Sequence, residues 1–247
     1  MLSEQRHELI LKLLEENGSV TVTEMKELLD TSESTVRRDI TALDREGKLV
    51  KVFGGAVTAE KHAVTAHEYT VAQKINLNQE EKEKIARYAV SLIEPEDFVY
   101  LDAGTTTGCM LDYIEEKRAV FVTNAVAHAQ RLASKGMKVL LVGGELKATT
   151  EAVIGTQAMR MIQGYHFTKG FFGTNGVTRE CGCTTPDANE AMVKQTAVEH
   201  CKNCYVVCDS SKFDQVSSVT FAPFSSSVYI TEQSAAGYET CDNILVV

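Results

Sequence analysis

Residues 31–47 constrain the fold most, because their order is typical of one capped, amphipathic helix. Ser32 can cap this helix, since a serine hydroxyl accepts a hydrogen bond from the N–H groups of the first turn. Val36, Ile40 and Leu43 recur at spacings of four and three, which places one apolar stripe along one helix face. Gly47 is expected to end the helix. The segment predicts an amphipathic helix that packs on a core and turns polar side chains outward.

The outward face of this helix and the segment after it carry hydroxyls and cations. Such groups contact phosphate oxygens and base edges in a major groove. The candidate DNA-binding residues are Ser32, Ser34, Thr35, Arg37, Arg38, Arg45, Lys48 and Lys51. Residues 1–57 hold 8 basic and 11 acidic side chains, but residues 37–51 hold 5 basic and 3 acidic ones. Positive charge therefore gathers where DNA would lie, although a solvated charged helix in an ordinary helical domain is the alternative.

Neighbouring segments complete the pattern of a winged helix-turn-helix. An upstream helix is predicted from apolar Leu9, Ile10, Leu13 and Leu14, and it closes at Asn17-Gly18. A second apolar set, Val20, Val22, Met25, Leu28 and Leu29, predicts a short helix capped by Thr23, followed by a turn over residues 30–33. Alternating residues over 48–57 predict a β-wing. We expect a DNA-binding domain over 1–57, with the helix-turn-helix at about 20–39.

Length and composition favour a two-domain protein. With 247 residues, of which 44 % are hydrophobic and 24 % charged, the chain can bury two cores. Residues 58–79 are poor in large aliphatic side chains and predict a linker, which leaves 80–247 as a larger domain. No apolar run reaches membrane-spanning length, and the N-terminus does not resemble a signal segment. A cytoplasmic protein without a membrane partner is expected.

The seven cysteines suggest a metal site only weakly. In a cytoplasmic protein we expect them to stay reduced. The spacing of Cys181 and Cys183, and of Cys201, Cys204 and Cys208, invites a zinc interpretation, but the second group is expected to cross from a helix into a strand, so its sulfurs need not converge. We therefore predict no metal, and expect His128 and His166 to be hydrogen-bonded structural histidines.

The larger domain is predicted to be a largely parallel α/β sheet covered on both faces. A helix capped by Asn78 and ended by Pro95 is followed by apolar strands, with helical patterns between most of them. The expected strands span residues 98–101, 119–122, 138–142, 170–173, 205–208 and 228–230. In such sheets ligands collect at the carboxyl ends of the strands. The residues after each strand are therefore the candidates for function.

Small or hydrogen-bonding residues follow five successive strands. Glycine lets a ligand approach the backbone, and a helix N-terminus favours an anion, so residues 102–107 resemble a phosphate cradle. They match neither a Walker A loop nor a dinucleotide fingerprint. The candidate effector-binding residues are Asp102, Gly104, Thr105, Thr106, Thr107, Thr123, Asn124, Gly143, Gly144, Asn175 and Lys212. Hydroxyls and Lys212 suit a phosphate, and the amide and carboxyl groups suit sugar hydroxyls. The alternative is that these groups only brace loops.

The chain resembles the DeoR family of bacterial transcriptional regulators. Its first domain matches the family pattern at Ser32, Thr35, Arg37, Arg38, Asp39, Leu43, Gly47 and Gly54-Gly55-Ala56, but has Lys51 and Phe53 where the family usually has arginine and histidine. The resemblance continues through Asp102-x-Gly-Thr-Thr, Thr123-Asn124, Gly143-Gly144, residues 173–176 and Asp209-x-Ser-Lys. Residues 143–152, 183–187 and 190–191 look most like the repressors of fructose or lactose/tagatose phosphate operons.

This resemblance implies a winged helix-turn-helix joined to an effector domain similar in fold to ribose-5-phosphate isomerase. The implied function is a DNA-binding repressor of a sugar catabolic operon, released by a phosphorylated sugar, with fructose 1-phosphate favoured over tagatose 6-phosphate. Its implied partners are double-stranded operator DNA, the sugar phosphate and further copies of itself. No cofactor and no catalytic residue are expected. The rival interpretation is a phosphosugar isomerase-like enzyme fused to a DNA-binding domain. Lys194 and Gln195 stand where the isomerases' Glu-Lys pair is expected, but nearby Glu190 keeps this interpretation open.

Overall fold

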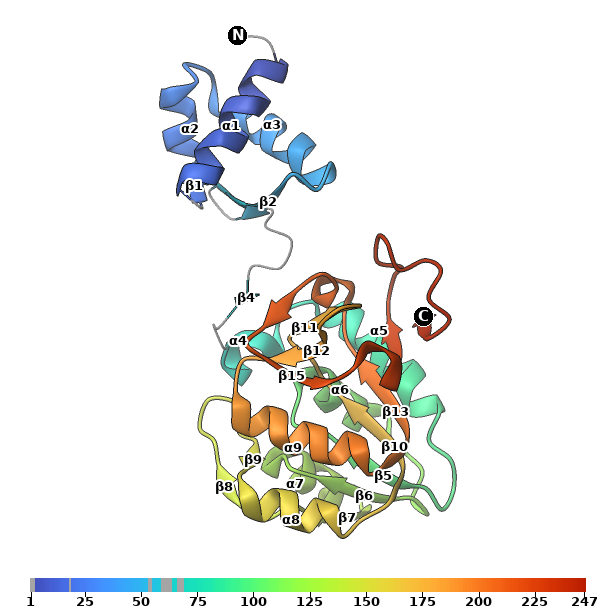
Figure 1. Cartoon of the computed structure of the whole chain (residues 1–247). Coiled ribbons are helices and arrows are strands. Elements are labelled where there is room, and N and C mark those ends of the chain that lie inside the picture. Colours follow the sequence, from blue (N-terminus) through green and yellow to red (C-terminus); the bar gives the residue numbers. More distant parts are fainter. Residues whose placement is uncertain (1–2, 18, 53–54, 59–63, 66–68) are drawn as a thin grey trace. The chain divides into compact units, whose positions relative to one another are not determined.

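A computed structural model describes residues 3–17, 19–52, 55–58, 64–65 and 69–247 of the chain (Figure 1). It divides into two compact units, residues 1–63 and 64–247, which are described separately. The predicted wing residues Phe53 and Gly54, and Gly18 of the expected helix end, lie outside the described residues.

The first unit packs three helices against a small antiparallel sheet. Its elements are α1 (Ser3–Asn17), β1 (Ser19–Thr21), α2 (Val22–Leu28), α3 (Glu33–Arg45), β2 (Leu49–Val52) and β3 (Gly55–Thr58). The sheet has the order β1-β3-β2, in which β2 and β3 form the expected hairpin. The predicted stripe of Val36, Ile40 and Leu43 is buried in the core. This confirms the helix-turn-helix with its following strand pair.

Side-chain caps set the starts of α2 and α3 in this unit. Ser32 caps α3 as predicted, because its Oγ accepts the N–H of Thr35 at 3.2 Å. The prediction that Thr23 caps α2 is wrong. Thr21 does so instead, since Thr21 Oγ1 accepts the N–H of Glu24 and Glu24 Oε2 accepts the N–H of Thr21 at 2.8 Å. This reciprocal pair satisfies two N–H groups that otherwise lack partners at a helix start.

A buried carboxylate ties α3 to α1. Asp39 is 4 % exposed and receives two hydrogen bonds from Arg6, at 2.6 Å from Nε and 3.0 Å from Nη2. The Nε2 of His7 lies 3.3 Å from Oδ1, the oxygen that also accepts from Nη2 of Arg6. Burial alone would raise the pKa of Asp39, but its hydrogen bonds and charge interactions with Arg6 and His7 lower it overall. Asp39 is therefore a packing anchor on the inner face of the helix.

The second unit is built on a seven-stranded parallel sheet with the order β17-β16-β13-β10-β5-β6-β7. These strands are β5 (Phe98–Leu101), β6 (Val120–Thr123), β7 (Lys138–Leu141), β10 (Phe167–Phe172), β13 (Cys201–Val207), β16 (Val228–Thr231) and β17 (Ile244–Val246). The predicted parallel sheet is confirmed. β5 has the expected limits, and the limits of the other predicted strands differ by at most four residues. The largest differences are at the starts of β10 and β13, where backbone pairing extends the strand beyond its apolar centre.

Helices cover both faces of this sheet (Figure 1). One apolar core includes residues of α5 (Gln79–Ser91), α6 (Thr105–Tyr113) and α7 (Val126–Ser134). The other includes residues of α8 (Thr156–Gln163) and α9 (Ala188–Glu199). The small elements are α4 (Val71–Ile75), β4 (Val64–Thr65), β8 (Glu145–Leu146), β9 (Val153–Ile154), β11 (Gly176–Thr178), β12 (Gly182–Thr185), β14 (Val216–Ser217) and β15 (Val219–Ala222). The antiparallel sheet β11-β12-β15 was not among the expected strands.

Three local predictions for this unit need correction. Asn78 precedes α5 but does not cap it, because its φ of 51° is left-handed and its amide donates to Asp209 at 2.9 Å. Residues 201–207 form one strand, so the expected helix-to-strand crossing within that cysteine group is wrong, since α9 already ends at Glu199. His128 is buried by packing, and its Nδ1 has no hydrogen-bond partner among the described residues. Burial lowers the pKa of His128 to about 4.

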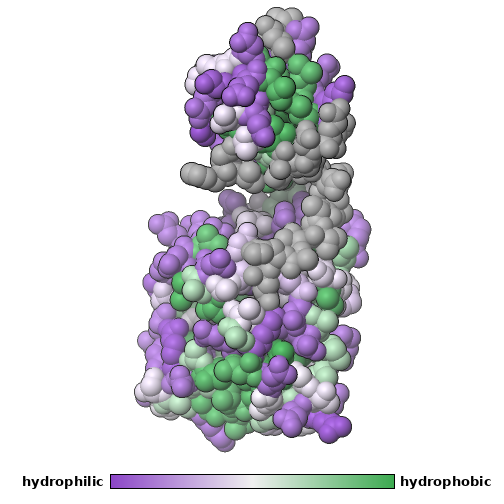
Figure 2. Space-filling view, turned by 90° about the vertical axis from the view of Figure 1, so that its left-hand side faces the viewer, coloured by the Kyte–Doolittle hydropathy of each residue, from purple (hydrophilic) through white to green (hydrophobic). Residues whose placement is uncertain are grey.

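The described surface carries apolar side chains at one end of the second unit. Figure 2 shows a hydrophobic area there, and the exposed large apolar residues of this unit include Leu141, Leu146 and Met192. Within the described residues, no helix combines the length and the apolar character that a membrane crossing requires.

Replacing Arg6 with methionine should destabilise the first unit, because Asp39 would remain buried without its cation. We expect faster hydrogen exchange in α1 and α3 of the intact protein at pH 7, and a fall of several degrees in the melting midpoint of this unit. Since folding lowers the pKa of Asp39, this contribution is present at neutral pH and disappears as pH falls through the folded-state pKa. The exposed Lys12→Met on the same helix is the control. Equal exchange in both variants would contradict the anchoring role.

Candidate functional site

The outer face of α3 presents one row of polar side chains. Ser34, Arg37, Arg38 and Arg45 are exposed, on the side opposite the buried stripe, and Thr41 lies between them half-buried. Their spacing of three, four and seven residues keeps them on one helix face. The predicted Lys48 and Lys51 are also exposed, directly after the helix. The structure therefore gathers the predicted DNA-binding residues at the surface around α3.

The basic side chains around α3 are not held by strong ion pairs within the part of the protein that the structure describes. Arg37 pairs with Glu33 at 2.6 Å and Lys48 with Glu46 at 2.8 Å, both exposed. Exposed pairs of this kind contribute only about 0–1 kcal/mol. Arg38 and Arg45 make no ion pair among the described residues. A phosphate group could therefore replace or add to these contacts at little cost.

The start of α3 and the strand β2 are held in fixed positions. Ser32 Oγ lies 2.9 Å from Ser34 Oγ and 2.8 Å from Thr35 Oγ1, so the three hydroxyls form one cluster at the positive end of the helix dipole. Asp44 accepts the backbone N–H of Lys51 at 2.9 Å, and the ammonium of Lys51 donates to Thr41 at 3.0 Å. Sequence reasoning missed Asp44, whose contact depends on how the hairpin folds back.

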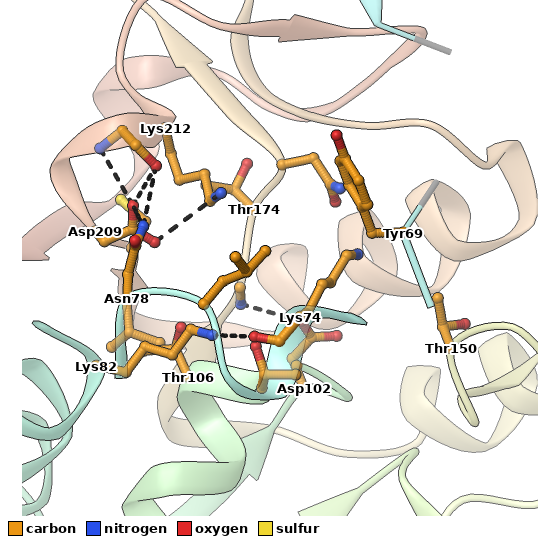
Figure 3. Close-up of a pocket in the computed structure, with 18 of the residues that line it drawn as sticks. Tyr69, Lys74, Asn78, Lys82, Asp102, Thr106, Thr150, Thr174, Asp209 and Lys212 are labelled. Atoms are coloured by element: carbon orange, nitrogen blue, oxygen red, sulfur yellow. Dashed lines mark hydrogen bonds and ion pairs between the residues drawn. The ribbon is translucent and has the colours of Figure 1, made fainter. Parts of the chain in front are cut away.

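A second site is a cavity of about 400 Å³ in the larger unit, beside the carboxyl ends of β5, β10 and β13 (Figure 3). Six of the predicted effector-binding residues line it: Asp102, Gly104, Thr105, Thr106, Asn175 and Lys212. They come from three separate parts of the chain, residues 102–106, Asn175 and Lys212. The structure thus brings together residues that the strand-end argument placed at one sheet edge.

The other five predicted residues do not line this cavity. Thr107 donates to the carbonyl of Asp102 at 2.6 Å and accepts the N–H of Gly104 at 3.0 Å. Thr123 accepts the N–H of Ala125 at 3.1 Å. Asn124 accepts from Ala103 at 3.1 Å and donates to the carbonyl of Val153 at 3.2 Å. These side chains are bonded to backbone that shapes the loops, and their contact with an effector stays a prediction.

Gly143 and Gly144 also lie away from the cavity. A Cβ on Gly144 would come within 2.6 Å of the carbonyl oxygen of Ile154, so glycine is required there by a close backbone approach. The N–H of Gly143 lies 3.5 Å from the sulfur of Met161. The two glycines serve the connection that leads into β8, and their expected contact with an effector is not supported by the geometry.

One end of the cavity collects positive charge. Gly104, Thr105 and Thr106 at the start of α6 line this end, and the first N–H groups of a helix have no intrahelical partners. Lys82 is 4 % exposed and donates to the backbone carbonyl of Lys74 at 2.5 Å, but it has no ion pair among the described residues. Burial lowers the pKa of Lys82. Lys212 lies at the same end, 4.0 Å from Asp209. An anion bound there would supply the charge partner that Lys82 lacks.

The floor of the cavity is a buried ion pair. Lys194 of α9 pairs with Oδ2 of Asp102, and the same ammonium donates to the carbonyl of Gly173 at 3.0 Å. The N–H of Gly173 donates back to Asp102 at 3.0 Å. These contacts join the ends of β5 and β10 to α9. Both of these contacts use Oδ2 of Asp102, and Oδ1 has no hydrogen-bond partner among the described residues, so Oδ1 can still accept from a sugar hydroxyl.

Several residues that line the cavity were not among the effector-binding residues predicted from the sequence. Tyr69 and Lys74 belong to the segment expected to be a linker, and Lys82 was not among the candidate residues. Thr150, Thr174, Glu190, Lys194, Asp209, Ser211, Gln215 and Ser217 also line the cavity. Glu190 and Lys194 are four residues apart on one helix, and this spacing was a usable signal. Within the described residues, no group of three or more His, Cys, Asp or Glu side chains could hold a metal ion.

Comparison with known families covers most of the chain. Residues 6–62 match the DeoR-like helix-turn-helix domain, and residues 77–233 match the DeoR C terminal sensor domain. The two matches fall on the two units of the structure.

Individual relatives are regulators. The chain is 41 % identical over 232 residues to the uncharacterized HTH-type transcriptional regulator FruR of Bacillus subtilis, covering 94 % of this chain and 91 % of that protein. It is 33 % identical to the lactose phosphotransferase system repressor of Streptococcus mutans, covering 90 % and 88 %. Among solved structures, ribose 5-phosphate isomerase A of Methanocaldococcus jannaschii is similar over 55 % of each chain, with 14 % identity and a TM-score of 0.42.

Replacing Lys82 with methionine should abolish stabilisation of the larger unit by inorganic phosphate. Phosphate that binds only the folded state raises stability by about 2.7 kcal/mol at a hundred times its dissociation constant. We expect the melting midpoint of the wild-type protein to rise with phosphate concentration and that of Lys82→Met to stay constant. Lys84→Met, exposed on the same helix, should respond like the wild type. An unchanged phosphate response in Lys82→Met would refute the anion site.

Proposed function

Because the chain belongs to the DeoR family of transcriptional regulators, we propose that it represses a sugar catabolic operon and is released from double-stranded operator DNA by a phosphorylated sugar. Fructose 1-phosphate is the favoured effector and tagatose 6-phosphate the next. The observation that carries the effector proposal is the buried ammonium of Lys82 beside the start of α6, which leaves an anion site inside a cavity with hydroxyl and amide groups.

The cavity offers a phosphate and a sugar different surroundings. Thr105, Thr106, Lys82 and Lys212 are suited to phosphate oxygens, since they combine helix N–H groups, hydroxyls and ammonium donors. Asn175 belongs with the lining groups that suit sugar hydroxyls. We propose these five, rather than Thr107, Thr123, Asn124, Gly143 and Gly144, as direct effector contacts.

The segment after the first unit offers a route from effector to DNA. Tyr69, Lys74 and Asn78 line the cavity, and Lys74 is held through its carbonyl by Lys82. A phosphate that recruits the Lys82 ammonium competes with this carbonyl, so occupancy changes how the segment is anchored. By linkage, an effector that binds the DNA-incompetent arrangement more tightly lowers DNA affinity by the same ratio, typically about 1–3 kcal/mol.

Self-association is part of this proposal. Paired recognition helices would read repeated half-sites, as in other helix-turn-helix proteins. The larger unit also exposes large apolar side chains, among them Leu141, Leu146 and Met192, which are available for a contact with a second copy.

An isomerase-like enzyme is the second candidate, because Glu190, Asp102 and Lys194 are buried around the cavity. Carboxylates in such a place can act as general acids or bases. Against catalysis, both Asp102 and Lys194 are bonded to each other and to Gly173. The relatives described above are regulators. We therefore propose binding without turnover.

Arg38→Ala should weaken DNA binding without unfolding the protein, because its side chain points away from the core. The lost contact corresponds to about 1–3 kcal/mol per subunit. The measurement is a gel shift at matched salt, with DNA that the wild-type protein selects from a random pool. Lys12→Ala removes a charge elsewhere in the same unit and should bind nearly as the wild type does. Full affinity in Arg38→Ala, and likewise in Arg37→Ala, would show that α3 does not read DNA.

Titration with fructose 1-phosphate or tagatose 6-phosphate should release the selected DNA and leave the sugar unchanged. We expect DNA affinity to fall by about 5- to 150-fold, the range of a typical coupling free energy. NMR spectra in D₂O after prolonged incubation should show no isomerised product and no deuterium at the carbon adjacent to the carbonyl. Product formation that Glu190→Gln abolishes would establish the enzyme instead, and retention of DNA at saturating sugar phosphate would exclude effector release.

A further inference from the structure

The end of the cavity opposite Lys82 is lined by a buried carboxylate. Figure 3 places Thr150 across the cavity from Lys82, Asn78 and Asp209, and the hydroxyl of Thr150 donates to Oε1 of Glu190. Glu190 lies in α9, lines the cavity and is 8 % exposed. Lys82 and Lys212 therefore line one end of the cavity, with Asp209 beside Lys212, and Glu190 lines the other end, with Lys147 beside it.

The two oxygens of Glu190 have different surroundings. Oε1 accepts from Thr150 and lies 3.2 Å from the ammonium of Lys147. Oε2 has no hydrogen-bond partner among the described residues. An ionised carboxylate can only accept hydrogen bonds. This oxygen therefore suits a hydroxyl donor and opposes another anion.

The cations near Glu190 are already engaged. Lys194, one turn further along α9, is bonded to Asp102 and to the carbonyl of Gly173. Lys147 also pairs with Asp187 at 3.0 Å. A second phosphate arriving at this end would meet an anionic group in a poorly hydrated place, where repulsion between like charges is strong.

We propose that Glu190 makes the cavity selective for sugars that carry a single phosphate. The phosphate lies at Lys82, Lys212 and the start of α6, and a sugar hydroxyl donates to Oε2 of Glu190. A sugar bisphosphate would place acceptor oxygens where the monophosphate has this hydroxyl donor, so it is rejected. This inference rests on the proposed sugar-phosphate function.

The test is calorimetry on the full-length protein with matched ligands. The pairs are fructose 1-phosphate with fructose 1,6-bisphosphate, and tagatose 6-phosphate with tagatose 1,6-bisphosphate. We expect the wild-type protein to bind the monophosphate of at least one pair about tenfold or more tightly than its bisphosphate, as like-charge juxtaposition predicts. Glu190→Gln keeps the side-chain volume and removes the charge. In this variant the ratio of the affinity for the monophosphate to that for the bisphosphate should approach one, mainly because the bisphosphate binds better.

Glu199→Gln is the matched control, because it removes a carboxylate from the same helix at an exposed position outside the cavity. Its ratio should equal that of the wild type. Equal affinities for both members of a pair in the wild type, or an unchanged ratio in Glu190→Gln, would overturn the role of Glu190 and leave the sensor function intact. Failure of all four sugar phosphates to bind would overturn both the selectivity and the proposed function.

Discussion

The buried ion pair between Asp102 and Lys194 is the contact on which the cavity depends. It joins the end of β5 to α9, and Gly173 at the end of β10 is hydrogen-bonded to both partners. A buried ion pair contributes little net stability compared with an apolar pair, but loss of one partner leaves an uncompensated charge in the interior. The pair thereby sets the positions of the two strand ends and of the helix that carries Glu190.

The smaller unit also contains a buried carboxylate that is paired with a cation. Asp39 lies in the middle of α3, yet it is buried and bonded to Arg6 of α1. In both units a carboxylate within a family motif is neutralised by a cation far away in the chain. The motif aspartates are therefore explained by packing, whereas Arg38, Lys82 and Lys212 carry the positive charge that remains available for external anions.

The distribution of charge matters more than its total. The chain has a formal net charge of −9, but residues 37–51 carry more basic than acidic side chains, and Lys82 and Lys212 lie at one end of the cavity. Phosphate groups are the shared chemistry of DNA and of a sugar phosphate, and both sites present lysine or arginine beside a helix start. An acidic remainder suppresses nonspecific adhesion to polyanions, so binding depends on these two local arrangements.

The sequence by itself determined the elements whose signals are local. The stripe of Val36, Ile40 and Leu43, the Ser32 cap and the apolar strands of the parallel sheet follow from periodicity and from backbone hydrogen-bonding needs. It also located six lining residues, because parallel strands end at one edge. Tertiary structure alone decided which strand-end groups face the cavity. Asn124 and Thr107 bond to nearby loops, while Lys82, Glu190 and Lys194 enter from helices. The physical reason is that the partner of a side chain depends on contacts between segments far apart in the chain. The spacing of residues along the sequence predicts local structure but does not predict those contacts.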